Sequence, residues 1–339
     1  MGKIRWGIMG PGNIVNRWMN GLRQVADAEV TAIAGRTKEN VDAMADKYSI
    51  PTRYYSYEDL AKSDKVDICY IAVPHTAHKD LAMLAMKNGK HVLVEKPISV
   101  NAEDVQAMID CARENNVFMM EAVWTRFFPL ALKVQQMISD GVIGDVRTVS
   151  ASFGYRTNIA LKERRTLNPA LAGGGLLDVG VYPLHFADMI YDRAPAELTG
   201  YAAIDSDEAH IQVDEQAVYI SKYDNGALAM MGTGVCTSMI DTAVIYGTGG
   251  MIILPVFWKP TKLELRIGRD APTFEEFDVP QPNPDYVDEG FQYEILHIHE
   301  CLAKGLKESP IMTMEKSLQI IKQCDTLRAQ WNLVYPFEK

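Results

Sequence analysis

The sequence has few cysteines and no excess of basic residues, and both features argue against several classes of protein. Its five cysteines, in 339 residues, are scattered and form no Cys-x-x-Cys pair, which argues against a secreted disulfide framework and favours a reducing compartment. The 34 Lys and Arg against 44 Asp and Glu give a formal charge of -10, which argues against a nucleic-acid partner and against binding to anionic membranes. No stretch approaches the roughly 20 apolar residues of a membrane span, and the N-terminus lacks the apolar core of a signal peptide. We therefore expect a cytoplasmic protein.

Short motifs of hydrolytic and metal-dependent chemistry are also missing. The chain has no Gly-x-Ser-x-Gly nucleophile motif and no His-Glu-x-x-His zinc motif. The histidine pairs His75/His78 and His297/His299 have no spacing that supports a metal site. We expect no metal, and we interpret these histidines mainly as structural, with His75 a candidate for contact with a cofactor.

Strands and helices alternate over the first 121 residues, which predicts βαβ units and a parallel sheet. Beyond about residue 122, from 196 to 279, strand-like runs follow one another without helices, which predicts a mostly antiparallel sheet in an α+β domain. We therefore expect an α/β chain with a dinucleotide-binding domain at 1–122 and a substrate-binding and oligomerisation domain at 123–339. The expected helix 314–331 would pack back on the first domain.

A glycine turn joins the first expected strand, 3–9, to the first expected helix, 14–25. Its sequence is Gly10-Pro11-Gly12-Asn13-Ile14. The first glycine permits a tight turn and the second lets the backbone approach a pyrophosphate, which then lies at the helix N-terminus. Val15 replaces the third small residue of the usual pattern. The context after a first strand predicts a dinucleotide site.

The residues after the second expected strand indicate which dinucleotide. An NAD-selective site usually has Asp or Glu there, to bind the ribose 2′-hydroxyl. This chain has Arg36 and Thr37, which suit a 2′-phosphate. We therefore expect NADP(H) in preference to NAD(H), although a solvated surface arginine would look the same in sequence.

Unusual residues also follow the other expected strands of the first domain. They are Pro74-His75, Glu95-Lys96-Pro97 and Glu121. Ligands of open α/β sheets bind outside the carboxyl ends of the strands, so these residues are expected along the cofactor edge. Lys96 can donate to a carbonyl oxygen there, and its charge would lower the pKa of a neighbouring phenol or imidazole.

Three strings together resemble one oxidoreductase family. Gly10–Gly12, the run 90–97 and the run Gly173–Tyr182 are similar to those of the Gfo/Idh/MocA family, over essentially the whole chain. The chain has Tyr182 where many members have His. With the segment Glu121–Pro129, this resembles most the branch of dimeric dihydrodiol dehydrogenases and NADP-dependent D-xylose dehydrogenases.

The resemblance implies a Rossmann domain, a second domain with a large open sheet, and NAD(P)-dependent oxidation or reduction of a sugar, polyol or vicinal diol. It also implies a catalytic group of Lys96, Asp178 and Tyr182, with Tyr182 exchanging the proton while hydride moves between nicotinamide and a carbinol carbon. Asp178 and Tyr182 are spaced i, i+4, so on a helix they would share one face. A homodimer or larger homo-oligomer through the C-terminal sheet is a further implication.

Two other functions stay open at this point: a regulatory protein that senses a dinucleotide without catalysis, and a glycosidase that uses a tightly bound NAD. The residues expected to bind substrate are Trp124, Phe127, Arg165 and Tyr182. The residues expected to bind cofactor are Gly10, Pro11, Gly12, Asn13, Ile14, Arg36, Thr37, Pro74, His75, His78, Glu95, Lys96, Pro97, Glu121, Trp124 and Arg126.

Overall fold

A computed structural model describes residues 2–161, 163–205 and 211–338. The chain divides into two units, each with its own sheet. The first unit comprises Met1–Trp124 and Val279–Leu318, and the second comprises Thr125–Asp278 and Gln319–Lys339. Each unit thus includes one segment from the last fifth of the chain.

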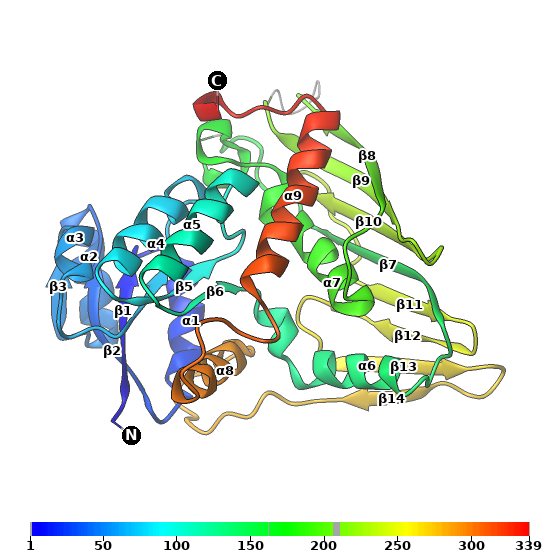
Figure 1. The fold of residues 1–339 in the computed structure, drawn as a ribbon, viewed down its shortest axis with the longest axis horizontal. Helices are drawn as coiled ribbons and strands as arrows, with labels where there is room; N and C mark the ends of the chain where they lie inside the picture. The colour runs from blue at the N-terminus through cyan, green and yellow to red at the C-terminus, as the bar shows by residue number, and fades with distance from the viewer. Residues whose placement is uncertain (1, 162, 206–210, 339) are drawn as a thin grey trace. The chain divides into compact units, whose positions relative to one another are not determined.

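Over the described residues, the first unit is built on a six-stranded sheet in which all neighbouring strands run parallel (Figure 1). Its strands are β1 (Ile4–Met9), β2 (Ala28–Ala34), β3 (Thr52–Tyr54), β4 (Ile68–Ile71), β5 (His91–Glu95) and β6 (Met119–Ala122). The order β3-β2-β1-β4-β5-β6 is that of the Rossmann fold. Successive strands are added on one side of β1 up to β3 and on its other side from β4 onward, so the strand order reverses between β1 and β4. The expected parallel sheet is confirmed.

Local sequence signals mark the ends of some helices of this unit. They are α1 (Ile14–Leu22), α2 (Lys38–Tyr48), α3 (Tyr57–Ala61), α4 (His78–Lys87), α5 (Ala102–Glu114) and α8 (Phe291–Ala303). The side chain of Asn101 caps α5 by accepting the N–H of Asp104 at 2.8 Å. Gly89 follows α4 with φ +75°, a left-handed conformation that suits glycine and ends the helix. α1 packs against α8, and α4 packs against α5.

Two short elements of the first unit were not expected from the sequence. The strand β3 has three residues, and the helix α3 has five. Both are too short to show a hydrophobic period, which needs several residues to recur. α1 also ends at Leu22, three residues before the expected end at Val25.

The second unit contains an eight-stranded sheet, counted over the described residues (Figure 1). Its strands are β7 (Val146–Gly154), β8 (Glu197–Ile204), β9 (Asp214–Lys222), β10 (Leu228–Gly234), β11 (Ala243–Gly247), β12 (Gly250–Leu254), β13 (Lys262–Ile267) and β14 (Thr273–Glu276). The order is β14-β13-β12-β11-β7-β10-β9-β8, antiparallel except for the parallel pair β7–β10. The expected large and mostly antiparallel sheet is confirmed.

Helices lie along one face of this sheet (Figure 1). They are α6 (Pro129–Ser139), α7 (Val181–Tyr191) and α9 (Met314–Gln330), whose residues from Gln319 onward belong to this unit. A single π-helical turn, Leu176–Gly180, precedes α7. The sequence predicts a continuous helix from Leu176 to Tyr191, and the wider turn at its start is a departure from that prediction.

The strands β9 and β10 show how the sheet separates its two faces. They form the hairpin that the turn Tyr223–Gly226 predicts, and Gly226 has φ +83°. Residues of β9 alternate between buried and exposed, as a strand with one covered face should. The exposed positions of the two strands nevertheless include the large apolar residues Val218, Ile220 and Met230.

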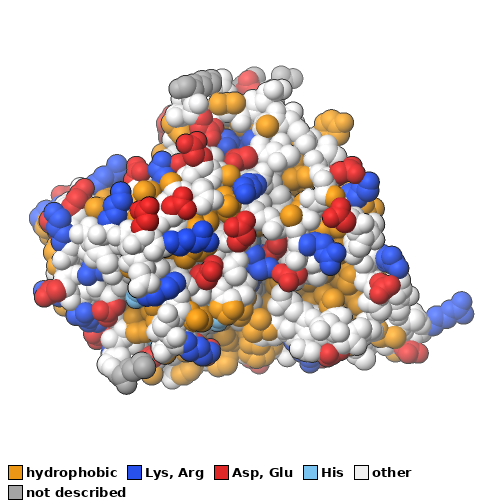
Figure 2. Space-filling model, viewed as in Figure 1, with side chains coloured by type: hydrophobic (Ala, Val, Ile, Leu, Met, Phe, Trp, Pro, Cys, Tyr) orange, Lys and Arg blue, Asp and Glu red, His pale blue; other side chains and the backbone are white. Residues whose placement is uncertain are grey.

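The surface and the cysteines agree with the composition. Figure 2 shows acidic and basic side chains interspersed over the face in view. All five cysteines are buried and carry free thiols. None of the helices in the described part of the chain combines the length and the apolar character that crossing a bilayer requires.

Candidate active site

The turn after β1 leaves no room for side chains, as close approach of a phosphate to the backbone requires. Gly10 has φ +104°, and a Cβ atom on it would lie 2.5 Å from the carbonyl oxygen of Ala72. A Cβ atom on Gly12 would lie 3.1 Å from the same oxygen. The side chain of Asn13 forms no capping hydrogen bond to α1. The turn and the first N–H groups of α1 therefore fit a dinucleotide pyrophosphate.

Arg36 and Thr37 are exposed directly after β2. The next residue, Lys38, is engaged with Asp42 at 2.6 Å. Arg36, in contrast, takes part in no ion pair with any residue that the structure describes. The Arg36 guanidinium and the Thr37 hydroxyl are thus placed to donate to a phosphate beside the end of β2.

The loop that carries Lys96 follows β5 and is held by polar contacts within the first unit. The hydroxyl of Tyr70 donates to Glu95 Oε1, and Glu95 Oε2 accepts the backbone N–H of Lys96 at 3.2 Å. The Lys96–Pro97 peptide bond is cis. Lys96 itself is half-buried. Glu95, expected to bind cofactor, thus has both oxygens engaged by protein groups and braces the lysine loop.

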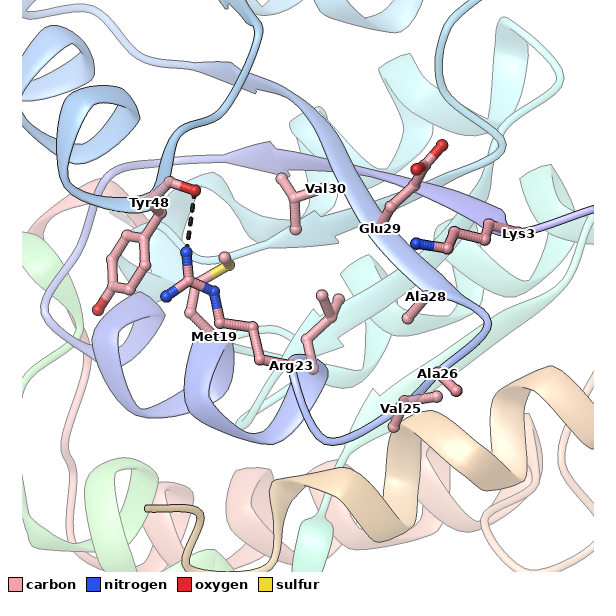
Figure 3. A pocket seen from close by; sticks show the side chains of 10 residues that line it. Lys3, Met19, Arg23, Val25, Ala26, Ala28, Glu29, Val30 and Tyr48 are labelled. Atoms are coloured by element: carbon pink, nitrogen blue, oxygen red, sulfur yellow. Dashed lines mark hydrogen bonds between the residues drawn. The ribbon is translucent and has the colours of Figure 1, made fainter. Parts of the chain in front are cut away.

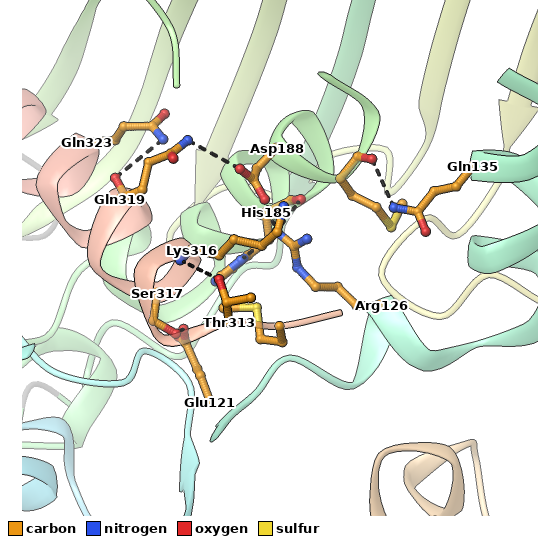
Figure 4. Close-up of polar contacts among 12 residues, drawn as sticks. Glu121, Arg126, Gln135, His185, Asp188, Thr313, Lys316, Ser317, Gln319 and Gln323 are labelled. Atoms are coloured by element: carbon orange, nitrogen blue, oxygen red, sulfur yellow. Dashed lines mark hydrogen bonds and ion pairs between the residues drawn. The ribbon is translucent and has the colours of Figure 1, made fainter. Parts of the chain in front are cut away.

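His78 and Glu121 also brace this loop. His78 is fully buried, and both ring nitrogens lie 2.9 Å from backbone carbonyl oxygens, one of them that of Pro97. Glu121 accepts the N–H of Ile98 at 3.0 Å and the hydroxyl of Ser317 at 2.7 Å (Figure 4). These contacts support the loop, and the cofactor contacts expected of both residues stay predictions.

The remaining predicted residues of this sheet edge lie at the carboxyl ends of β1, β4 and β5. His75 begins a 3-10 turn after β4, is 4% exposed, and has its ring 5.7 Å from that of His78. Pro74 precedes it and is half-buried. The first unit therefore brings the glycine turn, Pro74–His75 and the lysine loop to one edge of its sheet.

Trp124 and Phe127 are both buried. The Trp124 ring stacks on Phe291 with centroids 4.2 Å apart, and the guanidinium of Arg17 lies 5.4 Å from the Trp124 centroid. A protein ring therefore covers one face of the indole. The roles expected for Trp124 and Phe127 at cofactor and substrate stay predictions.

Arg126 is held in the second unit by α7. It is 2% exposed and donates to Asp188 Oδ2 at 2.6 Å and to the carbonyl oxygen of His185 at 3.1 Å (Figure 4). Gln319 donates to the other oxygen of Asp188 at 3.2 Å. This guanidinium balances a buried carboxylate and anchors α7, and the cofactor role expected of Arg126 stays a prediction.

Asp178 lies on the π-helical turn of the second unit, and two neighbours orient its carboxylate. Arg165 donates to Oδ1 at 2.6 Å, and the hydroxyl of Tyr155 donates to Oδ2. Burial, together with the charge of Asp178, raises the pKa of Tyr155, so this phenol stays protonated as a donor. The Asp178 side chain is 4% exposed, so its ion pair with Arg165 fixes the direction of the carboxylate.

Tyr182 is half-buried in the first turn of α7 and lies in an aromatic cluster. Its ring is 5.4 Å from that of Phe153 at an interplanar angle of 63°. Phe153 stacks on Trp258 with centroids 5.1 Å apart and planes 3° apart. We call Phe153, Tyr182 and Trp258 the aromatic cluster.

The end of β7 supplies two residues of this site that the sequence analysis missed. Phe153 contacts Tyr182. Tyr155, which is two residues further along the chain and directly follows β7, binds Asp178. Side chains two residues apart in an extended segment point to the same side. The sequence signal was present as aromatic residues in alternation at the end of an expected strand. Asp178 and Tyr182 thus face the same part of β7, although the turn between them is not a regular α-helix.

The candidate residues are divided between the units. The glycine turn, Arg36 and Lys96 belong to the first unit, whereas Arg165, Asp178 and Tyr182 belong to the second. Among the described residues, no three His, Cys, Asp or Glu side chains are grouped as a metal ion would require.

A cavity of about 290 Å³ lies in the first unit away from these residues (Figure 3). It is lined at the amino ends of β1 and β2 by Lys3, Ala28 and Glu29, and Arg23 reaches across it to the carbonyl oxygen of Tyr48 at 3.0 Å. Ligands of open α/β sheets bind at the carboxyl ends of the strands, so this cavity is not the expected cofactor site.

Both units match domains of one family. Residues 4–123 match the Gfo/Idh/MocA oxidoreductase family with its NAD-binding Rossmann fold, and residues 131–253 match the Gfo/Idh/MocA C-terminal domain. The trans-1,2-dihydrobenzene-1,2-diol dehydrogenase of Xenopus tropicalis is 34% identical over 98% of this chain and 99% of its own length. The human protein of the same name is 32% identical over 99% of each chain.

Solved structures share the fold at lower identity. An aldose-aldose oxidoreductase from Caulobacter crescentus, complexed with glycerol, has a TM-score of 0.85 and 23% identity over 96% of each chain. KijD10, a 3-ketoreductase from Actinomadura kijaniata in complex with NADP, has a TM-score of 0.79 and 23% identity over 96% of this chain and 97% of its own. With the full-length similarity to the dehydrogenases, these matches confirm the resemblance inferred from the motifs: the chain is an oxidoreductase that belongs to the Gfo/Idh/MocA family.

Proposed function

We propose that the protein is an NADP(H)-dependent dehydrogenase or reductase acting on a CH–OH group of a vicinal diol or sugar. The observation that carries the proposal is a buried, doubly anchored carboxylate, Asp178, one helical turn from a half-buried phenol, Tyr182, within a family of oxidoreductases. Relatives at 32% and 34% identity over the full chain are named as diol dehydrogenases, which supports a diol or sugar as substrate.

The residues assigned to the cofactor lie at the carboxyl ends of the strands of the first sheet. The turn Gly10–Gly12 and the start of α1 would hold the pyrophosphate, and Arg36 with Thr37 would hold the 2′-phosphate. Pro74, His75 and Lys96 complete the assignment at the same edge of the sheet. The nicotinamide, when bound, supplies the group that accepts or gives the hydride.

Tyr182 is assigned the proton transfer. It would take the proton from the substrate hydroxyl during oxidation and return it during reduction. An unperturbed tyrosine has a pKa of about 10, so a neighbouring positive charge is needed for it to act as a base near neutrality. Lys96 is assigned the donation of a hydrogen bond to the substrate oxygen, as its ammonium group carries that positive charge.

Asp178 and the aromatic cluster are assigned to the substrate. Arg165 and Tyr155 hold the Asp178 carboxylate in one direction, from which it can accept hydrogen bonds from substrate hydroxyl groups. The flat faces of Phe153 and Trp258 suit the apolar face of a sugar ring or a cyclic diol. Phe127 and Trp124, also expected near the substrate, are buried side chains, and their assignment to the substrate is kept in this proposal.

The cofactor assignment is tested by titrating the full chain with NADPH and with NADH and following fluorescence. We expect tighter binding of NADPH, and a loss of about tenfold to a hundredfold for NADPH in Arg36→Ala because one charge-assisted contact is removed. NADH binding should change little. The exposed Arg266→Ala in the second unit is the matched control. Equal affinity for both dinucleotides, unchanged in Arg36→Ala, would show that the 2′-phosphate assignment is wrong.

The substrate assignment is tested with the same protein by following nicotinamide absorbance. Cyclic trans-diols and aldoses are supplied with NADP⁺, and their two-electron oxidation products, the hydroxyketones and the lactones or keto-aldoses, with NADPH. Turnover that requires added dinucleotide supports the proposal. A dinucleotide that remains bound through purification and shows no net redox change during sugar cleavage would instead indicate a glycosidase, and binding without any turnover would indicate a sensor.

We also propose that the outer face of the eight-stranded sheet binds a second copy of the chain. A groove of about 320 Å³ runs over β7 to β10 and is lined largely by apolar residues. Tyr201, Val218, Ile220 and Met230 on this face are 82%, 58%, 48% and 46% exposed. Contiguous exposed apolar surface of this kind is typical of an interface between proteins. We call these four residues the outer patch.

A further inference from the structure

A fully buried carboxylate lies beside the glycine run that precedes Asp178. Asp214, the first residue of β9, is 0% exposed. Its Oδ2 accepts the backbone N–H of Leu176, the first residue of the π-helical turn, at 2.5 Å. A buried carboxylate is costly unless it is well bound, so this contact is the residue's main compensation. None of the roles assigned above uses Asp214.

The glycine run is shaped around this carboxylate. Gly174 has φ +116°, and a Cβ atom on it would lie 2.0 Å from Asp214 Oδ1. A Cβ atom on Gly175 would lie 3.4 Å from Asp214 Oδ2. A side chain at position 174 would therefore displace the carboxylate, and the conformation there is one that glycine adopts without strain.

Three carbonyl oxygens of the glycine run and the turn accept hydrogen bonds from side-chain hydroxyl groups. Thr233 of β10 donates to the carbonyl oxygen of Gly175 at 3.0 Å, and Tyr219 of β9 donates to that of Gly180 at 2.8 Å. Tyr335 donates to the carbonyl oxygen of Gly173 at 2.8 Å. These hydroxyl groups hold the carbonyl groups of the turn, and Asp214 provides the acceptor for its N–H group.

We propose that Asp214 is a positioning residue, whose carboxylate fixes the turn 174–178 and thereby the direction in which Asp178 is presented to the substrate. The structural part of this proposal stands on the contacts of Asp214 alone. The catalytic consequence rests on the proposed function, in which Asp178 contacts the substrate.

The charge on Asp214 should change near neutral pH. Burial raises the pKa of Asp214 to about 7, and the N–H groups of Leu176 and Gly175 and the charge of Arg328 oppose this rise. Among the described residues, the ionisable groups facing it are Arg328 of α9, Tyr219 of β9 and Tyr335 of the C-terminal segment, with Cys324 of α9 beside both tyrosines. Burial raises the pKa of both tyrosines well above 10, so they stay neutral while Asp214 titrates.

An ionised acceptor holds an N–H group about twice as strongly as a neutral one. The turn should therefore tighten as pH rises through about 7, when Asp214 loses its proton. In Asp214→Asn the side chain keeps its shape and one oxygen acceptor but carries no charge at any pH. The turn of this variant should behave at all pH values like that of the wild type at low pH.

The kinetic test compares kcat and KM against pH for the wild type, Asp214→Asn and the control Asp224→Asn, which changes an exposed residue of the β9–β10 turn. We expect kcat of the wild type to rise through about pH 7 and kcat of Asp214→Asn to lack this rise, falling about tenfold behind above it. KM for the dinucleotide should stay unchanged, because the residues assigned to it are in the first unit. Coincident pH profiles of Asp214→Asn and wild type would overturn the proposal.

A second measurement needs no substrate. Hydrogen exchange of the peptide covering 174–178, corrected for the intrinsic effect of pH, reports directly on the turn. We expect protection in the wild type to increase about tenfold from about pH 6 to about pH 8, and protection in Asp214→Asn to stay at the lower value. Protection that is independent of pH in the wild type overturns the proposal even if the variant does not fold.

The two measurements separate the two proposals. If no diol or sugar is turned over but protection of 174–178 follows the charge of Asp214, the proposed function is wrong and the positioning role of Asp214 stands. If turnover is found and neither the pH profile nor the exchange depends on Asp214, the proposed function stands and the positioning role of Asp214 is wrong.

Discussion

At the scale of single residues, the two hydrogen-bond partners of Asp178 are the basis on which the proposal gives separate roles to Asp178 and Tyr182. One carboxylate oxygen accepts from Arg165 and the other from Tyr155, so both oxygens of Asp178 already have hydrogen-bond donors. The proposed function accordingly assigns the proton transfer to Tyr182, the ionisable group of the aromatic cluster, and gives Asp178 the substrate hydroxyl groups.

Tyr182→Phe removes one oxygen atom and keeps the ring that packs on Phe153. We expect kcat to fall by about 10²–10⁴-fold, the usual contribution of general acid–base catalysis, while NADPH binding is retained. Steady-state kinetics and fluorescence titration measure the two quantities. Tyr246→Phe, which changes a surface tyrosine, should leave both unchanged. Full turnover of Tyr182→Phe would show that another group moves the proton.

Glu294 on α8 illustrates a residue-scale effect on stability. It is 0% exposed, and neither carboxyl oxygen has a hydrogen-bond partner among the described residues. Burial, and then the charges of Glu95 and Asp288, raise its pKa well above the ordinary value. Glu294 is therefore protonated in the folded protein at a pH where it would be ionised in the unfolded chain.

This raised pKa has a definite sign in the stability of the fold. The stability that the group contributes is complete below its unfolded pKa of about 4.3 and is lost as pH rises through its folded pKa. Glu294→Gln keeps the neutral shape and removes that loss. We expect the variant's thermal midpoint to rise relative to the wild type between about pH 5 and about pH 9. The exposed Glu300→Gln on the same helix is the control, and a constant difference across this range would contradict the interpretation.

At the scale of elements, the sequence predicted the strands, helices and turns that depend on residues close together in the chain. The run Val66–Ala72 is apolar apart from Asp67 and contains β4, which is buried at all four positions. Gly89 and the turn Tyr223–Gly226 mark chain reversals with residues that adopt a positive φ. The i, i+4 spacing of Asp178 and Tyr182 was informative but incomplete, because the first turn of the helix is of the π type.

The elements and contacts that the sequence did not predict depend on residues far apart in the chain. The glycine run and the π-helical turn that follows it are bound by Asp214, Thr233 and Tyr335, which are 38 or more positions away from the residues they contact. Arg126 and Glu121 are polar residues near a sheet edge and were expected to bind cofactor. Their partners Asp188 and Ser317 come from distant helices, and no local pattern indicates those pairs.

The cap of α5 gives a test at this scale. Asn101 accepts the N–H of Asp104 at 2.8 Å, so Asn101→Ala leaves that N–H without its acceptor. We expect the free energy of unfolding of the first unit to fall by about 1 kcal/mol, measured by denaturant unfolding followed by circular dichroism. Asn101→Asp keeps an acceptor and should lose little. Equal stability of the Ala and Asp variants would show that the cap contributes nothing.

At the scale of the whole molecule, the outer patch is the feature that a monomer leaves unexplained. Tyr201 pairs with Val218 across β8 and β9, and Ile220 pairs with Met230 across β9 and β10. These neighbours form an apolar strip on the sheet face opposite the helices, in a chain whose formal charge is -10. Association through this strip removes apolar area from water without bringing many like charges together.

We therefore expect the purified protein to sediment as a dimer or larger assembly, and Ile220→Glu with Met230→Glu to shift it to the monomer. Burying two carboxylates in an apolar interface costs several kcal/mol, enough to raise the dissociation constant by at least about a hundredfold. Sedimentation velocity measures this. Val287→Glu, which changes an exposed apolar residue of the first unit, is the control. A wild type that sediments as a monomer at all concentrations would refute the interface.

The burial of all five thiols has a practical consequence for studying this enzyme. Maleimide reagents modify accessible thiolates, and desolvation raises the pKa of Cys69 to about 12 and also that of Cys111 and Cys301. The native chain should therefore react slowly with such reagents. A single cysteine placed on an exposed loop of each unit would accept a fluorescent donor and acceptor without removal of any natural thiol. Energy transfer within that labelled pair would then show whether the distance between the two units changes during turnover.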